Sequence, residues 1–186
     1  MPSFDITPAT SALMLIDMQE RFLPVIPAMA SDQACGRNCR ILLEAARLLE
    51  VPTTISEQYP KGLGETLPYL RQAHPDAPRF EKMHFSCMDD PLLRMHLDSL
   101  GRAHVVLCGV ETHVCVLHTA ADLIAHGTGV VVAADAVSSR KDLHRDQALD
   151  AMRALGALLV PTESIVMRWQ RLAGTPVFKT LSALIK

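Results

Sequence analysis

Residues 104–125 read HVVLCGVETHVCVLHTAADLIA, and this stretch decides how the rest of the chain is interpreted. Its first seven residues form a continuous apolar run rich in β-branched side chains, which is typical of a parallel strand covered on both faces. Apolar residues then recur at helical spacing, and Thr112 is the expected N-cap. Cys115 therefore falls in the first turn of a helix that follows the carboxyl end of a strand.

The position of Cys115 favours a reactive thiol. Unpaired backbone N–H groups and the positive end of the helix dipole would lower its pKa from about 8.5 towards neutrality. Open α/β sheets also bind their ligands at such strand-to-helix turns. Free cysteines are, however, among the most buried residues, and most of them only fill space in a core. The local pattern leaves both interpretations open.

The composition limits the classes of protein to which this chain can belong. The chain has 186 residues, of which 49% are hydrophobic, and this predicts one domain that spans residues 1–186. The formal net charge is −2, without a basic stripe, so nucleic acid is not an expected partner. Five cysteines without a CxxC pair, and no signal peptide, predict a cytoplasmic location. No apolar run reaches the roughly 20 residues that span a bilayer, so no membrane association is expected.

Strand and helix patterns alternate along the chain. Apolar runs predict further strands at 11–18, 51–56, 78–86, 130–137 and 157–160, and amphipathic patterns predict helices at 32–50, 88–100, 142–155, 164–172 and 176–185. This order predicts an α/β protein with a three-layer, Rossmann-like open sheet, mostly parallel, and helices on both faces. Cys35 and Cys39 lie one turn apart on the first helix and are expected to be packing thiols, because no further metal ligands follow at matching spacing.

Two charged residues belong to predicted strands. Asp17 ends the run 11–18, where a buried carboxylate is costly unless it is paired or used. A helix cap or turn residue is the alternative role. Lys82 lies in the middle of 78–86, with His84 two residues later on the same face. A lone lysine is most often a solvated surface group.

The segment GVETHVCVLHTAADL, residues 109–123, resembles the cysteine motif of the isochorismatase-like hydrolases, in particular their small single-domain branch. D-x-Q at 17–19 and F-x-K at 80–82 resemble two further motifs of that family. The resemblance implies a cysteine-dependent hydrolase that acts on a small amide or ester-type substrate. Cys115 would be the nucleophile, Asp17 the general base and acid, and Lys82 the cation that holds both anionic groups.

The resemblance also implies an oxyanion hole. It would be formed by the backbone N–H groups of Glu111 and Cys115, with a cis peptide bond between Val110 and Glu111 turning the first of them inward. The expected lining of the substrate pocket is Gln19, Phe22, Tyr59, His84, Thr112 and His118.

A catalytic metal is not expected. In the metal-binding nicotinamidases of the same superfamily, the loop after the second strand carries an aspartate and histidines that ligate the ion. This chain has Glu57-Gln58-Tyr59 at that place, so we expect neither a metal nor another cofactor. Nicotinamide is therefore a less favoured candidate for the substrate.

Several alternatives stay open. His118 lies one turn beyond Cys115 and could act as its base. A thiol-redox or sensor protein would use Cys115 with Cys87 or Cys108 as the resolving thiol. Some small members of the resembling branch are described as ribonucleases, which the charge pattern here does not favour. Members of the family commonly associate through the C-terminal region, where this chain has an apolar stripe, and a homo-oligomer is therefore expected.

Overall fold

The structure is a computed structural model that describes residues 4–186. A six-stranded sheet forms its centre, in the order β3-β2-β1-β4-β5-β6, and every pair of neighbouring strands is parallel. The strands are β1 (Ser11–Ile16), β2 (Thr53–Gln58), β3 (Arg79–Lys82), β4 (His104–Val110), β5 (Gly129–Ser138) and β6 (Leu158–Val160). The prediction of an open parallel sheet is confirmed.

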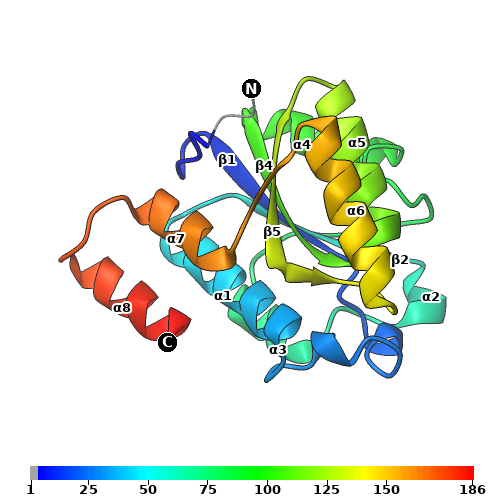
Figure 1. Ribbon diagram of the computed structural model, residues 1–186, viewed down its shortest axis with the longest axis horizontal. Coiled ribbons are helices and arrows are strands. Elements are labelled where there is room, and N and C mark those ends of the chain that lie inside the picture. The colour runs from blue at the N-terminus through cyan, green and yellow to red at the C-terminus, as the bar shows by residue number, and fades with distance from the viewer. Residues whose placement is uncertain (1–3) are drawn as a thin grey trace.

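Helices cover both faces of this sheet, which gives the predicted three layers (Figure 1). One face carries α1 (Ala34–Leu48), α3 (Pro68–Ala73) and α7 (Thr162–Gln170), and the other carries α4 (Pro91–Ser99), α5 (Leu117–Ala125) and α6 (Asp142–Leu155). The last helix, α8 (Pro176–Ile185), packs on α1 and α7 and does not touch the sheet directly in Figure 1. The short elements are η1 (Glu20–Phe22), η2 (Pro27–Met29), α2 (Pro60–Leu63) and η3 (Thr112–Val116).

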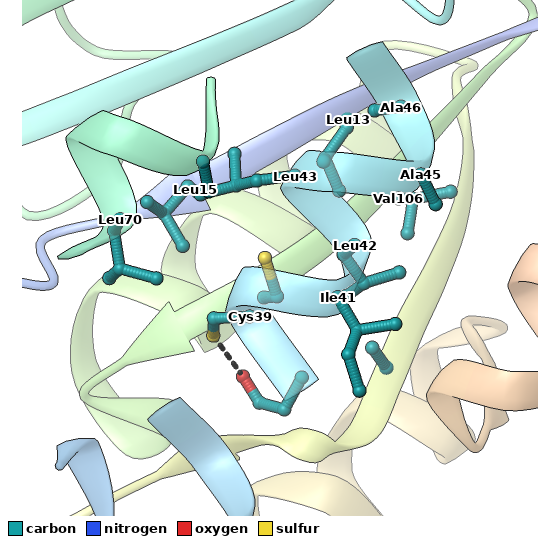
Figure 2. Close-up of a cluster of buried hydrophobic side chains, with 14 of the residues drawn as sticks. Leu13, Leu15, Cys39, Ile41, Leu42, Leu43, Ala45, Ala46, Leu70 and Val106 are labelled. Carbon is teal, nitrogen blue, oxygen red and sulfur yellow. Dashed lines mark hydrogen bonds between the residues drawn. The ribbon is translucent and has the colours of Figure 1, made fainter. Parts of the chain in front are cut away.

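An apolar cluster fills each interface between sheet and helices. Strand β1 supplies both clusters because successive side chains of a strand point to opposite faces: Leu13 and Leu15 join one cluster, and Met14 and Ile16 join the other. Figure 2 shows the first cluster, in which α1 lies across β1 and the Cys39 thiol donates a hydrogen bond to the Ala136 carbonyl at 3.3 Å. Cys35 and Cys39 are both buried in this cluster, as expected for packing thiols.

Several strand ends differ from the prediction, and the carboxyl ends of β2 and β3 matter for the site. β2 continues to Gln58, two residues beyond the predicted end, because its polar residues find hydrogen bonds inside the protein. β3 ends at Lys82, opposite Gln58, and residues 83–85 leave the sheet with exposed side chains. An apolar pattern could not reveal either end, because side-chain hydrogen bonds decide them.

Among residues 4–186, no helix is both long enough and apolar enough to cross a bilayer.

Candidate active site

The carboxyl ends of β1, β3 and β4 bring the three expected catalytic residues together. Asp17 follows β1, Lys82 ends β3, and Cys115 lies in the turn after β4. Lys82 Nζ donates a hydrogen bond to Asp17 Oδ2 at 2.8 Å, and the Cys115 thiol lies close enough to the same carboxylate for its charge to raise the pKa of the thiol. The sheet edge at which open α/β proteins bind ligands thus holds a thiol close to a paired carboxylate and ammonium group.

Asp17 is held by its backbone and by a neighbouring strand. Its φ of 51° lies in the left-handed region, which few residues other than glycine adopt and which aspartate tolerates better than most. Its side chain is completely buried, and Ser56 Oγ donates to Oδ1 at 2.7 Å. The carboxylate therefore points away from solvent, with one oxygen facing Ser56 and the other facing Lys82.

A glycine in β4 allows β1 to place Asp17 there. Gly109 pairs with Ile16, the residue before Asp17, and has a φ of 114°. A Cβ atom on residue 109 would lie 2.1 Å from the Ile16 carbonyl oxygen. Any side chain at this position would force β1 and β4 apart, and with them Asp17 and the turn that carries Cys115.

Lys82 is completely shielded from solvent, and its ammonium group contacts only protein oxygen atoms among the described residues. Besides Asp17 these are Gln58 Oε1 at 2.7 Å and the carbonyls of His84 and Phe85 at 3.2 and 3.4 Å. Burial alone would lower the pKa of Lys82, but the charge of Asp17, with help from the thiols, raises it above its usual value. Lys82 is therefore a cation at neutral pH.

Cys115 lies in η3, a π-helical turn that precedes α5. The Glu111 carbonyl accepts hydrogen bonds from the amides of Val114 and Val116 at 3.1 and 3.2 Å. Glu111 is thus the N-cap residue, and the prediction that Thr112 caps the helix is wrong. The Thr112 Oγ1 atom is instead buried without a hydrogen-bond partner in the described part of the chain.

The expectation of a lowered thiol pKa is also wrong. Burial raises the pKa of the Cys115 thiol well above its usual value, the nearby Asp17 charge raises it further, and Lys82 only partly opposes them. The side chain is 5% exposed, so water does not stabilise a thiolate at this place. The resting site therefore pairs a protonated thiol with a carboxylate, as general-base activation of the sulfur requires.

The turn between β4 and η3 has the expected peptide geometry, because the bond between Val110 and Glu111 is cis. The Glu111 side chain is tied down by Arg140, whose backbone N–H and Nε donate to Glu111 Oε1 at 3.2 and 2.9 Å. This ion pair anchors the segment that leads into η3.

Two neighbouring cavities lie at this end of the sheet, and Lys82 is the candidate catalytic residue that lines one of them. One, of about 310 Å³, is lined by Tyr59, Pro60, Lys61, Glu81, Lys82, Met83, His84 and Asp90. The other, of about 460 Å³, is lined by Met83, His84, Phe85, Ser86, Asp89, His118 and Asp122. Three of the expected pocket residues, Tyr59, His84 and His118, line these cavities, which share Met83 and His84.

The other expected pocket residues do not line these two cavities. Gln19 is completely buried, and its side-chain amide bonds to the backbone of Gln58 and Gly64. Phe22 packs against the apolar cluster that contains α1. His118 is exposed, and its Nδ1 lies 2.8 Å from the Val114 carbonyl, so this nitrogen must carry the proton.

The residues at the place of the nicotinamidase ligands are engaged in other bonds. Glu57 Oε1 accepts hydrogen bonds from the backbone N–H and the Oγ1 of Thr66 at 2.8 and 2.6 Å, and Gln58 bonds to Lys82. Within residues 4–186, no group of three or more His, Cys, Asp and Glu side chains is arranged to hold a metal ion. This donor set does not fit a divalent ion.

Ser56 and Gln58 were not predicted to take part in the site. Both lie on β2, two residues apart and so on the same face, and they bond to the two members of the ion pair. Polar residues that alternate at the carboxyl end of a buried strand were the available signal. Cys87 was considered only as a redox partner, yet its backbone N–H donates to Thr119 Oγ1 at 3.0 Å and the charges of Asp17 and Lys82 act on its thiol, which places it beside the site.

Comparison with known proteins shows the family of the chain. A family model described as the isochorismatase domain matches residues 11–164. The chain belongs to the isochorismatase family. Isochorismatase domain-containing protein 2A of Mus musculus is 42% identical over 182 residues, which cover 97% of this chain and 85% of that protein. The chain is thus an isochorismatase-family hydrolase.

Solved structures of similar proteins have the same fold. The MAR1 ribonuclease of Caenorhabditis elegans is 38% identical, with a TM-score of 0.87 and coverage of 97% of this chain and 91% of that one. The YcaC gene product of Escherichia coli, described as an octameric hydrolase of unknown specificity, has a TM-score of 0.91 at 24% identity, with coverage of 99% and 92%. The likeness to YcaC concerns the isochorismatase fold alone.

Proposed function

We propose that this protein is a cysteine-dependent hydrolase of a small amide or ester, with Cys115, Asp17 and Lys82 as its catalytic residues. One observation carries the proposal: the Asp17 carboxylate is paired with Lys82 at 2.8 Å and lies close enough to Cys115 for its charge to raise the pKa of the thiol. All three side chains are buried, and the cavity of about 310 Å³ that Lys82 lines has the size of a small-molecule site.

In the proposed first step, the Cys115 sulfur attacks the carbonyl carbon of the substrate while its proton passes to Asp17. A nucleophile with a raised pKa needs such a base, because little thiolate exists before the substrate binds. The negative charge that develops on the carbonyl oxygen would be stabilised by the backbone N–H groups of Glu111 and Cys115. The hydrogen bonds from Val114 and Val116 to the Glu111 carbonyl support this role, because they hold the turn that carries both N–H groups.

In the proposed second step, the tetrahedral intermediate collapses and Asp17 returns the proton to the leaving nitrogen or oxygen. The acyl group is then bound to Cys115 as a thioester. Water, activated by Asp17, attacks this thioester and releases the acid and the free thiol. Lys82 remains an ammonium ion throughout and offsets the negative charge that moves between the sulfur, Asp17 and the substrate oxygen.

The contacts favour Asp17 over His118 as the base. Asp17 lies close enough to Cys115 to raise the pKa of its thiol, whereas the His118 Nδ1 proton is used on the Val114 carbonyl and the His118 ring is exposed. A nicotinamidase-like activity would need metal ligands where Glu57 and Gln58 are otherwise bonded. A redox function would need Cys115 to be oxidised more readily than the raised pKa allows.

A ribonuclease is the second candidate, because the C. elegans relative at 38% identity carries that name. The net charge of −2 is unfavourable for a protein that binds a polyanion. Titration of labelled RNA at 50 and 200 mM salt, together with a cleavage assay, would test it. Tight, salt-sensitive binding with cleavage that is lost in Cys115→Ala would favour the ribonuclease.

We also propose that the chain forms a homo-oligomer in the cytoplasm. Helix α8 buries only Leu181 fully and leaves Val177 38% exposed, so part of its apolar surface is free to contact a second copy. The octameric state described for the E. coli neighbour is in line with this. All five cysteines are unpaired, which favours a reducing compartment. Light scattering after size-exclusion chromatography would give the mass of the assembly.

Cys115→Ala and Cys115→Ser test the nucleophile. Both variants should lose hydrolysis of a panel of primary carboxamides, N-carbamoyl compounds and small esters, and mass spectrometry should detect no acyl adduct on residue 115. Cys35→Ala is the matched control, since it removes a buried thiol from the opposite face of the sheet. The thermal unfolding of all variants is measured in parallel. A folded Cys115→Ala protein that keeps most of its turnover would remove the nucleophile assignment.

A further inference from the structure

Gln58 connects the catalytic ammonium group to the wall of the substrate cavity. Its Oε1 accepts from Lys82 Nζ at 2.7 Å, and its Nε2 donates to the Met83 carbonyl at 2.9 Å. Only one orientation of the amide satisfies both bonds, because an ammonium group can only donate and a carbonyl can only accept. The two contacts therefore fix the direction of the side chain.

The backbone of Gln58 is equally constrained. Gln19 Oε1 accepts from the Gln58 N–H at 2.8 Å, and Gln19 Nε2 donates to the Gln58 carbonyl at 3.0 Å. Gln58 also stands opposite Lys82 in the register of β2 and β3. Two residues earlier on β2, Ser56 holds Asp17. One strand thus provides a donor for the anion and an acceptor for the cation of the ion pair.

We infer that Gln58 is a positioning residue of the hydrolase site: it holds the Lys82 ammonium group against Asp17 and Cys115, and it fixes the loop 83–85 that lines the cavities. This inference rests on the proposed function. An ammonium group has three protons, and here one is bound by Asp17, one by Gln58, and one is shared by the more distant carbonyls of His84 and Phe85. Without Gln58, the cation would lose its shortest bond to a neutral group and could turn away from Asp17.

The side-chain nitrogen of Gln58 holds the loop 83–85 through the Met83 carbonyl. Residues 83–85 have exposed side chains, with Met83 67% and Phe85 59% exposed, while their three carbonyls bond to Gln58 and Lys82. The loop is thus fastened by its backbone, and its side chains are free to meet a ligand in either cavity. A change at Gln58 should therefore affect both the chemical step and substrate affinity.

The test is a double-mutant cycle between Gln58→Met and Lys82→Met. Each protein is treated with iodoacetamide, and the alkylation rate of Cys115 is followed by peptide mass spectrometry from pH 7 to pH 10. Gln58→Met should lower the rate at pH 8 about tenfold, which is the scale of one lost hydrogen bond to a charged group. In the Lys82→Met background, the same substitution should have no further effect. Gln72→Met, at an exposed position of α3, is the control and should leave the rate unchanged.

The same four proteins are unfolded with urea, which gives a readout that does not depend on the reactivity of the thiol. Gln58→Met should lower the urea midpoint when residue 82 is lysine and leave it unchanged in the Lys82→Met background. Only a protein with Lys82 has a buried ammonium proton that loses its hydrogen-bond acceptor. Equal effects of Gln58→Met in both backgrounds, or none in either, would overturn the inference. Loss of turnover in Cys115→Ser is a separate result, so failure of the proposed hydrolysis would be recognised independently.

Discussion

Lys82 Nζ lies 2.8 Å from Asp17 Oδ2, and both side chains are completely shielded from solvent. Transfer of two charges from water into a protein interior is costly, and their attraction offsets this cost only while both are present. The pair is therefore better explained by chemistry than by stability. It also makes each partner dependent on the other.

Removal of one partner should destabilise the fold more than removal of both. Asp17→Asn and Lys82→Met should each lower the free energy of unfolding by about 3–5 kcal/mol, because each leaves the remaining charge buried without its opposite partner. The double variant should lose less than either single variant, and therefore clearly less than the sum of the two losses. Urea unfolding of the four proteins measures this. The exposed pair Glu65 and Arg71 is the control, and its cycle should give a coupling below about 1 kcal/mol. Additive losses at Asp17 and Lys82 would contradict the buried pairing.

Asp17→Asn should also lower the rate of hydrolysis by about 10²–10⁴-fold, the usual contribution of a positioned acid or base. The amide keeps the shape of the side chain but cannot accept the thiol proton. Asp89→Asn is the control, because Asp89 lines the larger cavity without contact to the ion pair in the described residues. Turnover at saturating substrate gives the comparison, and a loss as small as that of Asp89→Asn would leave Asp17 with a structural role only.

Lys82→Met should slow the alkylation of Cys115. Lys82 is the group that lowers the raised pKa of this thiol, so its removal raises the pKa further and reduces the thiolate present at pH 8–9. Each additional pKa unit corresponds to about a tenfold slower reaction. His118→Gln should leave the profile unchanged. The opposite result, in which His118→Gln shifts the profile and Lys82→Met does not, would establish a cysteine–histidine pair.

Chelation should not affect hydrolysis. Activity is measured before and after dialysis against EDTA and 1,10-phenanthroline, and metal content is determined by mass spectrometry. Glu57 and Gln58 are bonded to Thr66 and Lys82, so neither is expected to bind a divalent ion. Stoichiometric zinc, iron or manganese, with activity that chelators abolish and the metal restores, would make a nicotinamidase-like amidase the better proposal.

Stability should decrease at alkaline pH because of the buried thiols. Burial, and then the charge of Asp17, raises the pKa of Cys87 to about 12, from about 9 in the unfolded chain. The protonated thiol thus contributes fully to stability below about pH 9, and this contribution is lost as the pH rises towards 12. The loss amounts to about 1.4 kcal/mol per pH unit for each such thiol. The urea midpoint of Cys87→Ala should therefore fall less steeply between pH 9 and pH 11 than that of the original protein. Parallel curves for the two proteins would show that Cys87 does not titrate in this way.

Much of the fold was determined by local sequence. The continuous apolar run at 104–110 is a strand because both of its faces are covered, and α6 and α8 begin and end at the predicted residues. Apolar spacing is sufficient there, since the same side chains that define the pattern form the buried face. For Asp17, Lys82 and Cys115 the local pattern left an ordinary structural role open, and the resemblance to the isochorismatase-like hydrolases selected them.

The tertiary structure alone decided how these residues work. Ser56 and Gln58 reach Asp17 and Lys82 across separations of 39 and 24 residues, so no local pattern could reveal that they hold the ion pair. The protonation of Cys115 was decided in the same way. A position at the start of a helix predicts a lowered thiol pKa, but packing against Asp17 and the surrounding core removes the water that would stabilise a thiolate. The charge state of a side chain depends on everything that surrounds it in space, and the sequence specifies those surroundings only through the completed fold.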